Sequence, residues 1–68
     1  MNPRLIQLMN EYLDSCKIGD IFGNLDFIEY VKDRCPKFAP ARSQVGRIVK
    51  MTGRCKPTDW CGYYEVIA

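Results

Sequence analysis

A basic segment runs from Ala41 to Lys56, with the sequence ARSQVGRIVKMTGRCK, five cationic side chains and no carboxylate. Arg can donate two hydrogen bonds to guanine O6 and N7, and Gln can pair with adenine N6 and N7. Lys and Arg also neutralise phosphates, which strengthens binding to nucleic acid without reading its sequence. The segment therefore has the side chains for duplex DNA recognition, provided that they share one exposed face.

A helix over residues 41–52 would give these side chains one face. At about 100° per residue, Ser43, Arg47 and Lys50 fall within about 60° of one another. Arg54 joins this stripe if the helical geometry extends that far. The other side of the helix is apolar and carries Val45, Ile48, Val49 and Thr52. The two stripes lie back to back, so packing of the apolar stripe turns the basic stripe outward.

The candidate DNA-binding residues are Arg42, Ser43, Gln44, Arg47, Lys50, Arg54 and Lys56. We expect Arg47 and Gln44 to reach base edges, and Arg42 and Lys50 to bind phosphates. Ser43, near the helix N-terminus, suits a phosphate or a base edge.

Two other interpretations of the basic stripe stay open. The stripe can be the solvated face of an amphipathic helix, although solvated faces normally mix both signs of charge. It can also bind a protein partner with an acidic surface. Gly46, on the flank of the stripe, costs about 1 kcal/mol of helix propensity relative to Ala, which suggests a close approach to the backbone there.

Charge is distributed unevenly over the rest of the chain. Residues 1–33 hold three bases and six acids, residues 34–56 hold seven bases and no acid, and residues 57–68 hold two acids. The formal net charge of +2 therefore conceals one electropositive region. Such a region attracts polyanions, which favours nucleic acid as the partner.

The length of 68 residues predicts a single domain over residues 1–68. A chain of this size buries only about 60% of its unfolded surface, so its core is thin. The sequence has no apolar run of the roughly 18–20 residues that a membrane span requires, and its N-terminus does not resemble a signal peptide. We therefore expect a cytoplasmic protein without membrane contact.

Apolar periodicity predicts two helices in the first half of the chain. The first has Pro3 in its first turn and a buried face at positions 5, 8, 9, 12, 13 and 16. The second begins at an Asn24 N-cap, has Asp26 in its first turn and ends before Pro36. Its buried face is Phe27, Ile28, Val31 and Cys35. Residues 18–22 (IGDIF) predict a short strand between the two helices.

The second half of the chain predicts a third helix and a hairpin. The connector PKFAPA leads to the helix over residues 41–52, and we expect Phe38 to anchor this connector to the core. Gly53 ends the helix. The segments RCKP and CGYYEVIA flank the turn-forming PTD and predict a β-hairpin. Tyr64 and Val66 alternate with Tyr63 and Glu65, as in a half-buried strand.

This element order, with the residues NLDFIEYVKDRCPKFAPARSQVGRIVKMTG followed by a terminal hairpin, resembles the winged helix-turn-helix family. The resemblance implies an α+β fold with three helices, a short strand and a C-terminal β-hairpin wing. It also implies a small DNA-binding protein, a transcriptional or replication regulator, that docks the helix at about 41–52 in the major groove of double-stranded DNA. The wing departs from the family pattern. Its tip, KPTDW, opposes Lys56 with Asp59, whereas family wings often present Arg or Lys.

An alternative function is a protein–protein interaction adaptor on the same scaffold, with Trp60, Tyr63 and Tyr64 as its contact surface. For Trp60 we favour packing within the hairpin or core over an exposed stacking platform. A homodimer and a further protein partner both stay open.

The cysteines are best interpreted as structural, and we expect no cofactor and no metal. Cys16 and Cys35 fall on apolar faces and suit small core positions. A zinc site would need all four cysteines to converge, since closely spaced ligand pairs are missing. A disulfide between Cys55 and Cys61 across the hairpin stays open, although the cytoplasm disfavours it. The chain has no histidine and no Gly-rich phosphate loop, so we do not expect an enzyme.

Overall fold

The computed structural model describes residues 2–68, and within them the chain has an α+β fold. The helices are α1 (Pro3–Asp14), α2 (Asn24–Arg34), the 3₁₀ turn η1 (Pro36–Phe38) and α3 (Arg42–Thr52). The strands are β1 (Ile21–Gly23), β2 (Cys55–Pro57) and β3 (Tyr63–Val66). The coarse fold class and the order of elements that we predicted are thus confirmed.

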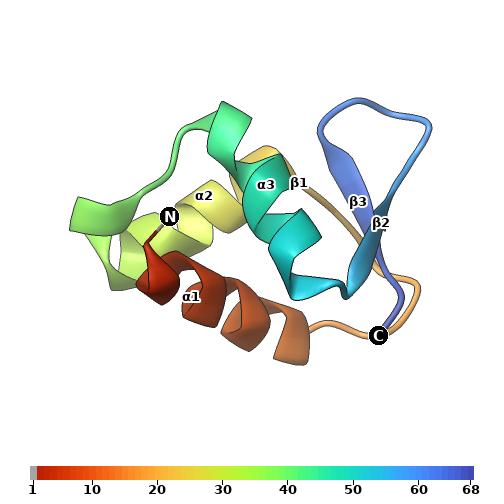
Figure 1. The fold of residues 1–68 in the computed structure, drawn as a ribbon, viewed down its shortest axis with the longest axis horizontal. Coiled ribbons are helices and arrows are strands. Elements are labelled where there is room, and N and C mark those ends of the chain that lie inside the picture. The colour runs from red at the N-terminus through yellow and green to blue at the C-terminus, as the bar shows by residue number, and fades with distance from the viewer. Residues whose placement is uncertain (1) are drawn as a thin grey trace.

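A small antiparallel sheet joins the segment between α1 and α2 to the C-terminal hairpin. Its strand order is β1-β3-β2, so β1 pairs with the second arm of the C-terminal hairpin. The register places Phe22 opposite Tyr64, and Cys55 opposite Val66. In Figure 1 the hairpin stands beside α3, while α1 runs below α3. The sheet therefore fixes the hairpin next to the helix that carries the basic stripe.

The first strand is shorter than the segment we predicted. Strand pairing begins at Ile21 rather than Ile18, because the chain turns before it. Gly19 has a φ of 96°, in the left-handed region that favours glycine. Its N–H donates to the carbonyl of Val66 at 2.8 Å. This hydrogen bond anchors the turn to the last residue of β3.

Side chains and glycines define the helix ends. Gly23, not Asn24, is the N-cap of α2. The carboxylate of Asp26 accepts a hydrogen bond from the Gly23 N–H at 2.7 Å, which satisfies one of the free donors at the helix start. Helix α3 ends where we predicted, because Gly53 adopts a left-handed conformation with a φ of 67°.

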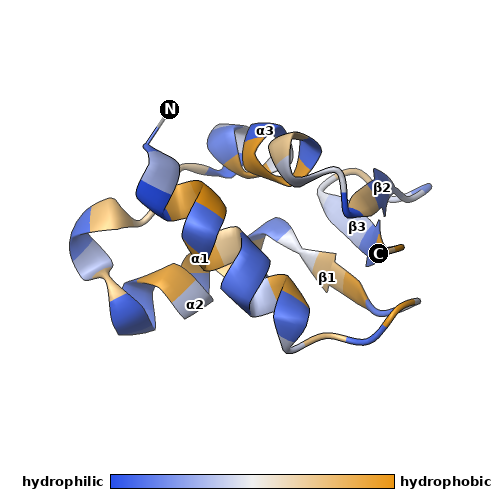
Figure 2. Cartoon of the chain, turned by 60° about the horizontal axis from the view of Figure 1, so that its bottom comes forward, coloured by the Kyte–Doolittle hydropathy of each residue, from blue (hydrophilic) through white to orange (hydrophobic). Residues whose placement is uncertain are grey.

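The core lies where the three helices meet the inner face of the sheet. Figure 2 shows that hydrophobic and hydrophilic residues alternate around each helix in stripes. The buried side chains in the described part of the chain are Leu5, Leu8, Met9, Leu13, Phe22, Phe27, Ile28, Val31, Val45, Ile48, Val49 and Val66. Tyr12 packs edge-to-face on Phe22 and Tyr30, with ring centroids 5.3 and 5.1 Å apart. Helices and sheet are thus joined by one continuous cluster.

The connector between α2 and α3 is held differently from our expectation. Phe38 is 43% exposed, so the prediction that it anchors the connector to the core is wrong. The 3₁₀ turn over Pro36–Phe38 has no buried residue. Pro40 is buried instead, directly before α3 begins. Within residues 2–68, no helix has the length and the apolar character needed to cross a membrane.

The two phenylalanines Phe27 and Phe38 allow a matched test of this core. Phe27 is fully buried, so Phe27→Ala should lower the free energy of unfolding by about 3–5 kcal/mol. Phe38→Ala should change it by less than about 0.5 kcal/mol, as expected for a surface position. Urea unfolding followed by circular dichroism measures both. Equal losses for the two variants would contradict the burial that the structure assigns.

Candidate nucleic-acid interface

Helix α3 is amphipathic in the way that its sequence predicts. Val45, Ile48 and Val49 are buried in the core. Ser43, Arg47 and Lys50 are exposed, on the other side of the helix. Arg42, the first helical residue, and Gln44 are also exposed. The prediction of back-to-back stripes within α3 is confirmed.

The exposed cations of α3 carry uncompensated charge. The ion pairs found in residues 2–68 are Arg54 with Asp14 and Lys56 with Glu65. Arg42, Arg47 and Lys50 take part in neither pair, so within the described chain no carboxylate forms an ion pair with them. Uncompensated cations on a single face of one helix produce a local positive potential.

A groove separates α3 from the hairpin. It has a volume of about 410 Å³. Its lining residues are Gly46, Arg47, Val49, Lys50, Cys55, Pro57 and Tyr64. The cations of this set come from α3, while the hairpin supplies the apolar ring of Pro57 and the aromatic ring of Tyr64. The lining, as far as the structure describes it, contains no carboxylate, so an anionic ligand meets no like charge there.

The close approach that we inferred at Gly46 is made by Tyr64. A Cβ atom on Gly46 would lie 3.0 Å from the Tyr64 hydroxyl oxygen. The Tyr64 ring packs on Phe22, with centroids 5.6 Å apart, so the sheet holds it in place. Burial raises the pKa of the Tyr64 hydroxyl, and Cys61 raises it further. The hydroxyl is therefore a neutral hydrogen-bond donor at neutral pH, on a residue that lines the groove.

Arg42 lies away from this groove. It lines a second depression, of about 290 Å³, together with the first turn of α2 and residues 61–63 of the hairpin. Asp26 also lines this depression, so a carboxylate lies near Arg42, although it forms no ion pair with it and accepts the hydrogen bond from Gly23. The basic face of α3 therefore has two sectors, with Arg42 in one and the pair Arg47 and Lys50 in the other.

Gln44 does not present a free amide to the solvent. Its side-chain oxygen accepts a hydrogen bond from the Ala41 N–H at 2.9 Å. This contact caps the start of α3, where the first N–H groups have no partner inside the helix. A bidentate pair with adenine needs both the oxygen and the nitrogen of the amide. In this conformation Gln44 caps the helix, so the base contact that we predicted would require its side chain to leave this hydrogen bond.

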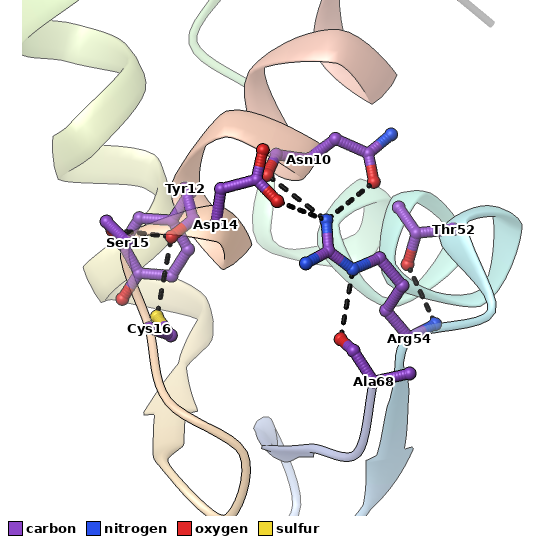
Figure 3. A network of polar contacts seen from close by, with 8 residues as sticks. All are labelled: Asn10, Tyr12, Asp14, Ser15, Cys16, Thr52, Arg54 and Ala68. Carbon is purple, nitrogen blue, oxygen red and sulfur yellow. Dashed lines mark hydrogen bonds and ion pairs between the residues drawn. The ribbon is translucent and has the colours of Figure 1, made fainter.

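Arg54 belongs to a structural network and not to the basic stripe (Figure 3). Helix α3 ends at Thr52, so the helical geometry does not extend to Arg54 as the predicted stripe required. Its guanidinium forms an ion pair with Asp14 at 2.9 Å and donates to the Asn10 carbonyl at 3.3 Å. It also donates to the carbonyl of Ala68 at 3.0 Å. Arg54 thus connects the end of α1, the exit of α3 and the C-terminus.

Lys56 points away from α3. Cys55 and Pro57 line the groove, and side chains alternate along a strand, so Lys56 lies on the opposite face of the hairpin. It pairs there with Glu65 at 4.0 Å, and not with Asp59 as the sequence suggested. The structure therefore does not bring Lys56 together with Arg47 and Lys50.

The hairpin turn exposes its tryptophan. Trp60 is 65% exposed, so the packed position that we favoured is wrong. It lines a third depression, of about 320 Å³, with Tyr63 and Ile21. Tyr64 is half-buried and faces the groove, so it does not share a surface with Trp60. Ile21 was not among our candidates, although its alternation with the buried Phe22 predicts an outward side chain.

All four cysteines are free thiols in the described part of the chain. Cys55 pairs with Val66 at the open end of the hairpin, whereas Cys61 lies near the turn, so the disulfide that we left open is not formed. Cys16 and Cys35 pack against the core, as predicted. Burial raises the pKa of the Cys16 and Cys55 thiols. Within residues 2–68, no cluster of three or more His, Cys, Asp or Glu side chains could hold a metal ion.

The interface that the structure assembles is thus narrower than the one predicted from the sequence. Arg42, Ser43, Arg47 and Lys50 lie on the exposed side of α3, with the groove and Tyr64 beside them. Gln44, Arg54 and Lys56 make contacts within the chain. No protein-family model, curated protein or solved structure matches this chain.

The Arg54 network predicts a difference between two arginines that the sequence places in one stripe. Arg54→Ala should lower the free energy of unfolding by about 1–1.5 kcal/mol, because it removes the ion pair with Asp14 and the hydrogen bonds to Asn10 and Ala68. Arg47→Ala, which removes the same charge from an exposed position, should stay within about 0.5 kcal/mol. Denaturant unfolding of both variants measures the difference. If Arg47→Ala proves the more destabilising, the structural role of Arg54 is wrong.

The contact between Gly46 and Tyr64 predicts coupling between α3 and the hairpin. Gly46→Ala alone should destabilise the protein, since the new methyl group meets the Tyr64 oxygen at 3.0 Å. In a Tyr64→Phe background the same change should stabilise it, by up to about 1 kcal/mol from helix propensity. A double-mutant cycle of unfolding free energies measures this coupling. Additive effects would mean that the two residues do not touch.

Proposed function

We propose that this chain is a winged helix-turn-helix protein that binds double-stranded DNA, with α3 in the major groove and the β2–β3 hairpin as its wing. One observation carries the proposal. The exposed face of α3 holds Arg42, Arg47 and Lys50 without a carboxylate partner, while the opposite face is buried in the core. The order of α2, a short connector, α3 and a hairpin supports the same assignment.

The side chains of α3 then take different roles. An α-helix fits the major groove, and the N-terminal part of a recognition helix commonly contacts base edges. Ser43 lies in this part of α3 and Arg47 lies one turn further on, and both are exposed, so Arg47 is our candidate for reading guanine. Arg42 and Lys50 bind phosphates on either side, which sets the position of the helix on the duplex.

The groove beside α3 gives the wing a role that does not depend on basic residues at its tip. We propose that one sugar-phosphate backbone enters this groove. Among the lining residues, Lys50 supplies a charge and the neutral Tyr64 hydroxyl supplies a hydrogen-bond donor. This explains how a hairpin whose one lysine pairs with Glu65 contributes to binding.

The biological setting follows from the same proposal. A single small domain that binds duplex DNA is suited to regulating transcription or replication. A cytoplasmic location agrees with four thiols that remain unpaired, since disulfides are rare in that compartment.

A second candidate function is a protein-interaction adaptor. The observation that favours it is the exposure of Trp60 and Tyr63 on the sheet, because large exposed aromatic residues are enriched at protein interfaces. Tyr64, which we had grouped with them, belongs to the other face. An adaptor of this kind should show no affinity for duplex DNA at low salt.

Fluorescence anisotropy with a labelled duplex tests the proposal. Log K should fall linearly with log salt, with a slope of about −3 if Arg42, Arg47 and Lys50 each neutralise one phosphate. Arg47→Ala should weaken a preferred site by about 1–3 kcal/mol and relax its base preference. Lys50→Ala should weaken all duplexes equally and reduce the slope by about 1.

Lys17→Ala is the control, since Lys17 is exposed in the turn before β1, at the other end of the sheet from the hairpin turn. It removes the same charge and should leave the affinity within about twofold, apart from the small effect of net charge. Absence of binding at about 50 mM salt, where phosphate contacts are strongest, would rule out the DNA-binding function.

A further inference from the structure

The groove between α3 and the hairpin has two kinds of lining. Arg47 and Lys50 are exposed, and within the described chain they form no ion pair. The other side chains of the lining are mostly apolar, and they are Val49, Cys55, Pro57 and Tyr64. Pockets for small molecules have volumes of roughly 300–1,000 Å³ and combine an apolar lining with a few polar groups. With about 410 Å³, this groove has both the size and the composition of such a pocket.

A sugar-phosphate backbone satisfies only part of this lining. Its phosphates suit Lys50 and the Tyr64 hydroxyl, but the side chains of Val49 and Pro57 have no polar atoms. Sugar oxygens and base edges that leave water beside these two side chains gain no hydrogen bond from them in return, which costs free energy. An apolar group in the same place is stabilised because it leaves water. The apolar part of the groove therefore favours an apolar ligand over a nucleotide.

Contacts within the protein hold the groove in shape before any ligand binds. Tyr64 lies on β3, the central strand of the sheet, and its ring packs on Phe22 with the centroids 5.6 Å apart. Val49 is 3% exposed, so the core fixes its position. The Tyr64 hydroxyl also reaches the backbone of α3 at Gly46. A ligand that enters a preformed site loses less free energy to ordering the protein.

The cations of the groove suit a carboxylate on the same ligand. Arg47 and Lys50 are three positions apart on α3, so their side chains are neighbours on the helix surface. The planar guanidinium of Arg can donate two parallel hydrogen bonds to one carboxylate. A carboxylate carries a single charge, so it costs less to bring beside apolar side chains than a doubly charged phosphate does. The lining, within the described residues, contains no acidic side chain that would repel it.

We propose that this groove is a binding site for a small aromatic carboxylate, and that the bound ligand excludes the sugar-phosphate backbone. Arg47 and Lys50 hold the carboxylate. The aromatic ring packs on Val49, Pro57 and Tyr64. Binding of the ligand does not depend on the DNA-binding function, whereas the exclusion rests on it, because the duplex must use the same groove. A compound of this class then releases the protein from DNA, which makes the groove a regulatory site.

Heteronuclear NMR of the chain without DNA tests the binding, with 2-naphthoate as the probe. With about 13 non-hydrogen atoms, this probe should bind with a dissociation constant on the order of 1 mM. The backbone amide signals that should shift together are those of Gly46, Cys55 and Tyr64. The signals of Ile21 and Trp60, which line a different depression, should stay in place. Shifts confined to this second pair, or no shifts up to about 10 mM probe, overturn the proposal.

Two further probes separate the contributions of the ring and the charge. The neutral 2-naphthamide keeps the ring without the charge, and inorganic phosphate carries charge without the ring. Each should bind at least about threefold more weakly than 2-naphthoate, because each lacks one of the two interactions. If either binds as tightly as 2-naphthoate, one half of the lining contributes nothing and the proposal is wrong.

Two lysines on opposite sides of the hairpin provide a matched pair of variants. Lys50→Ala should raise the dissociation constant of 2-naphthoate about three- to tenfold, because it removes a cation from the groove. Lys56 pairs with Glu65 on the other face of the hairpin, so Lys56→Ala should leave the constant unchanged within about twofold. Equal effects of the two variants would show that net charge attracts the probe and that the groove does not, which overturns the proposal.

The duplex assay tests the exclusion. About 10 mM 2-naphthoate should weaken duplex binding about tenfold if it competes with a dissociation constant of about 1 mM. Sodium acetate at the same concentration matches the ionic strength and should weaken it by less than about twofold. A probe that binds the groove without weakening duplex binding overturns the exclusion. A chain that binds 2-naphthoate but no duplex contradicts the DNA-binding function, and the exclusion with it, while it confirms the ligand site.

Discussion

The burial of one side of α3 is the constraint on which the rest of the structure depends. Val45, Ile48 and Val49 are part of the core shared with α1 and α2, so they fix the rotation of α3 about its own axis. In a chain of this size, the free energy from three buried aliphatic side chains, about 1.5–3 kcal/mol each, is a large share of the net stability. Any rotation that hid the cations would expose these residues. The outward position of Arg47 and Lys50 is therefore a consequence of packing, and the same contacts that fold the protein present its charge.

The contacts of Arg54 fix the position of the C-terminal half of the chain relative to the helices. Three segments far apart in the sequence, the end of α1, the exit of α3 and the last residue, meet around one guanidinium (Figure 3). The left-handed Gly53 turns the chain out of the helical path, and this places the next side chain over α1 rather than along the basic stripe. Because of Gly53, the arginines before and after it have different roles. Arg47 on the helix remains free, and Arg54 after it stabilises the start of the hairpin.

The sequence correctly predicted the elements that are determined by residues only a few positions apart. Helix periodicity, the proline after α2 and the glycine after α3 act within a few residues, so the helices appear close to the predicted bounds. The sequence predictions failed where the position of a side chain depends on a residue that is distant in the sequence. Lys56 pairs with Glu65 across the hairpin, and Trp60 is exposed because no other element of the described chain covers the turn.

Of the candidate site, Arg42, Ser43, Arg47 and Lys50 lie on the predicted face, whereas Arg54 and Lys56 do not. Gln44 is also exposed on α3, but its side chain caps the start of the helix, a role that Gln often takes in the first turn.

The pair of Gly46 and Tyr64 shows how the two halves of the groove are coupled. Tyr64 is held by Phe22 on the sheet, and its hydroxyl reaches the backbone of α3 at the one position without a side chain. Glycine lowers the helix propensity at this position, but the absence of a side chain allows the hairpin to pack close to α3. A larger residue at position 46 would push the hairpin outward and widen the groove. The distance between the cations of α3 and the hairpin is thus determined by the steric contact between Gly46 and Tyr64.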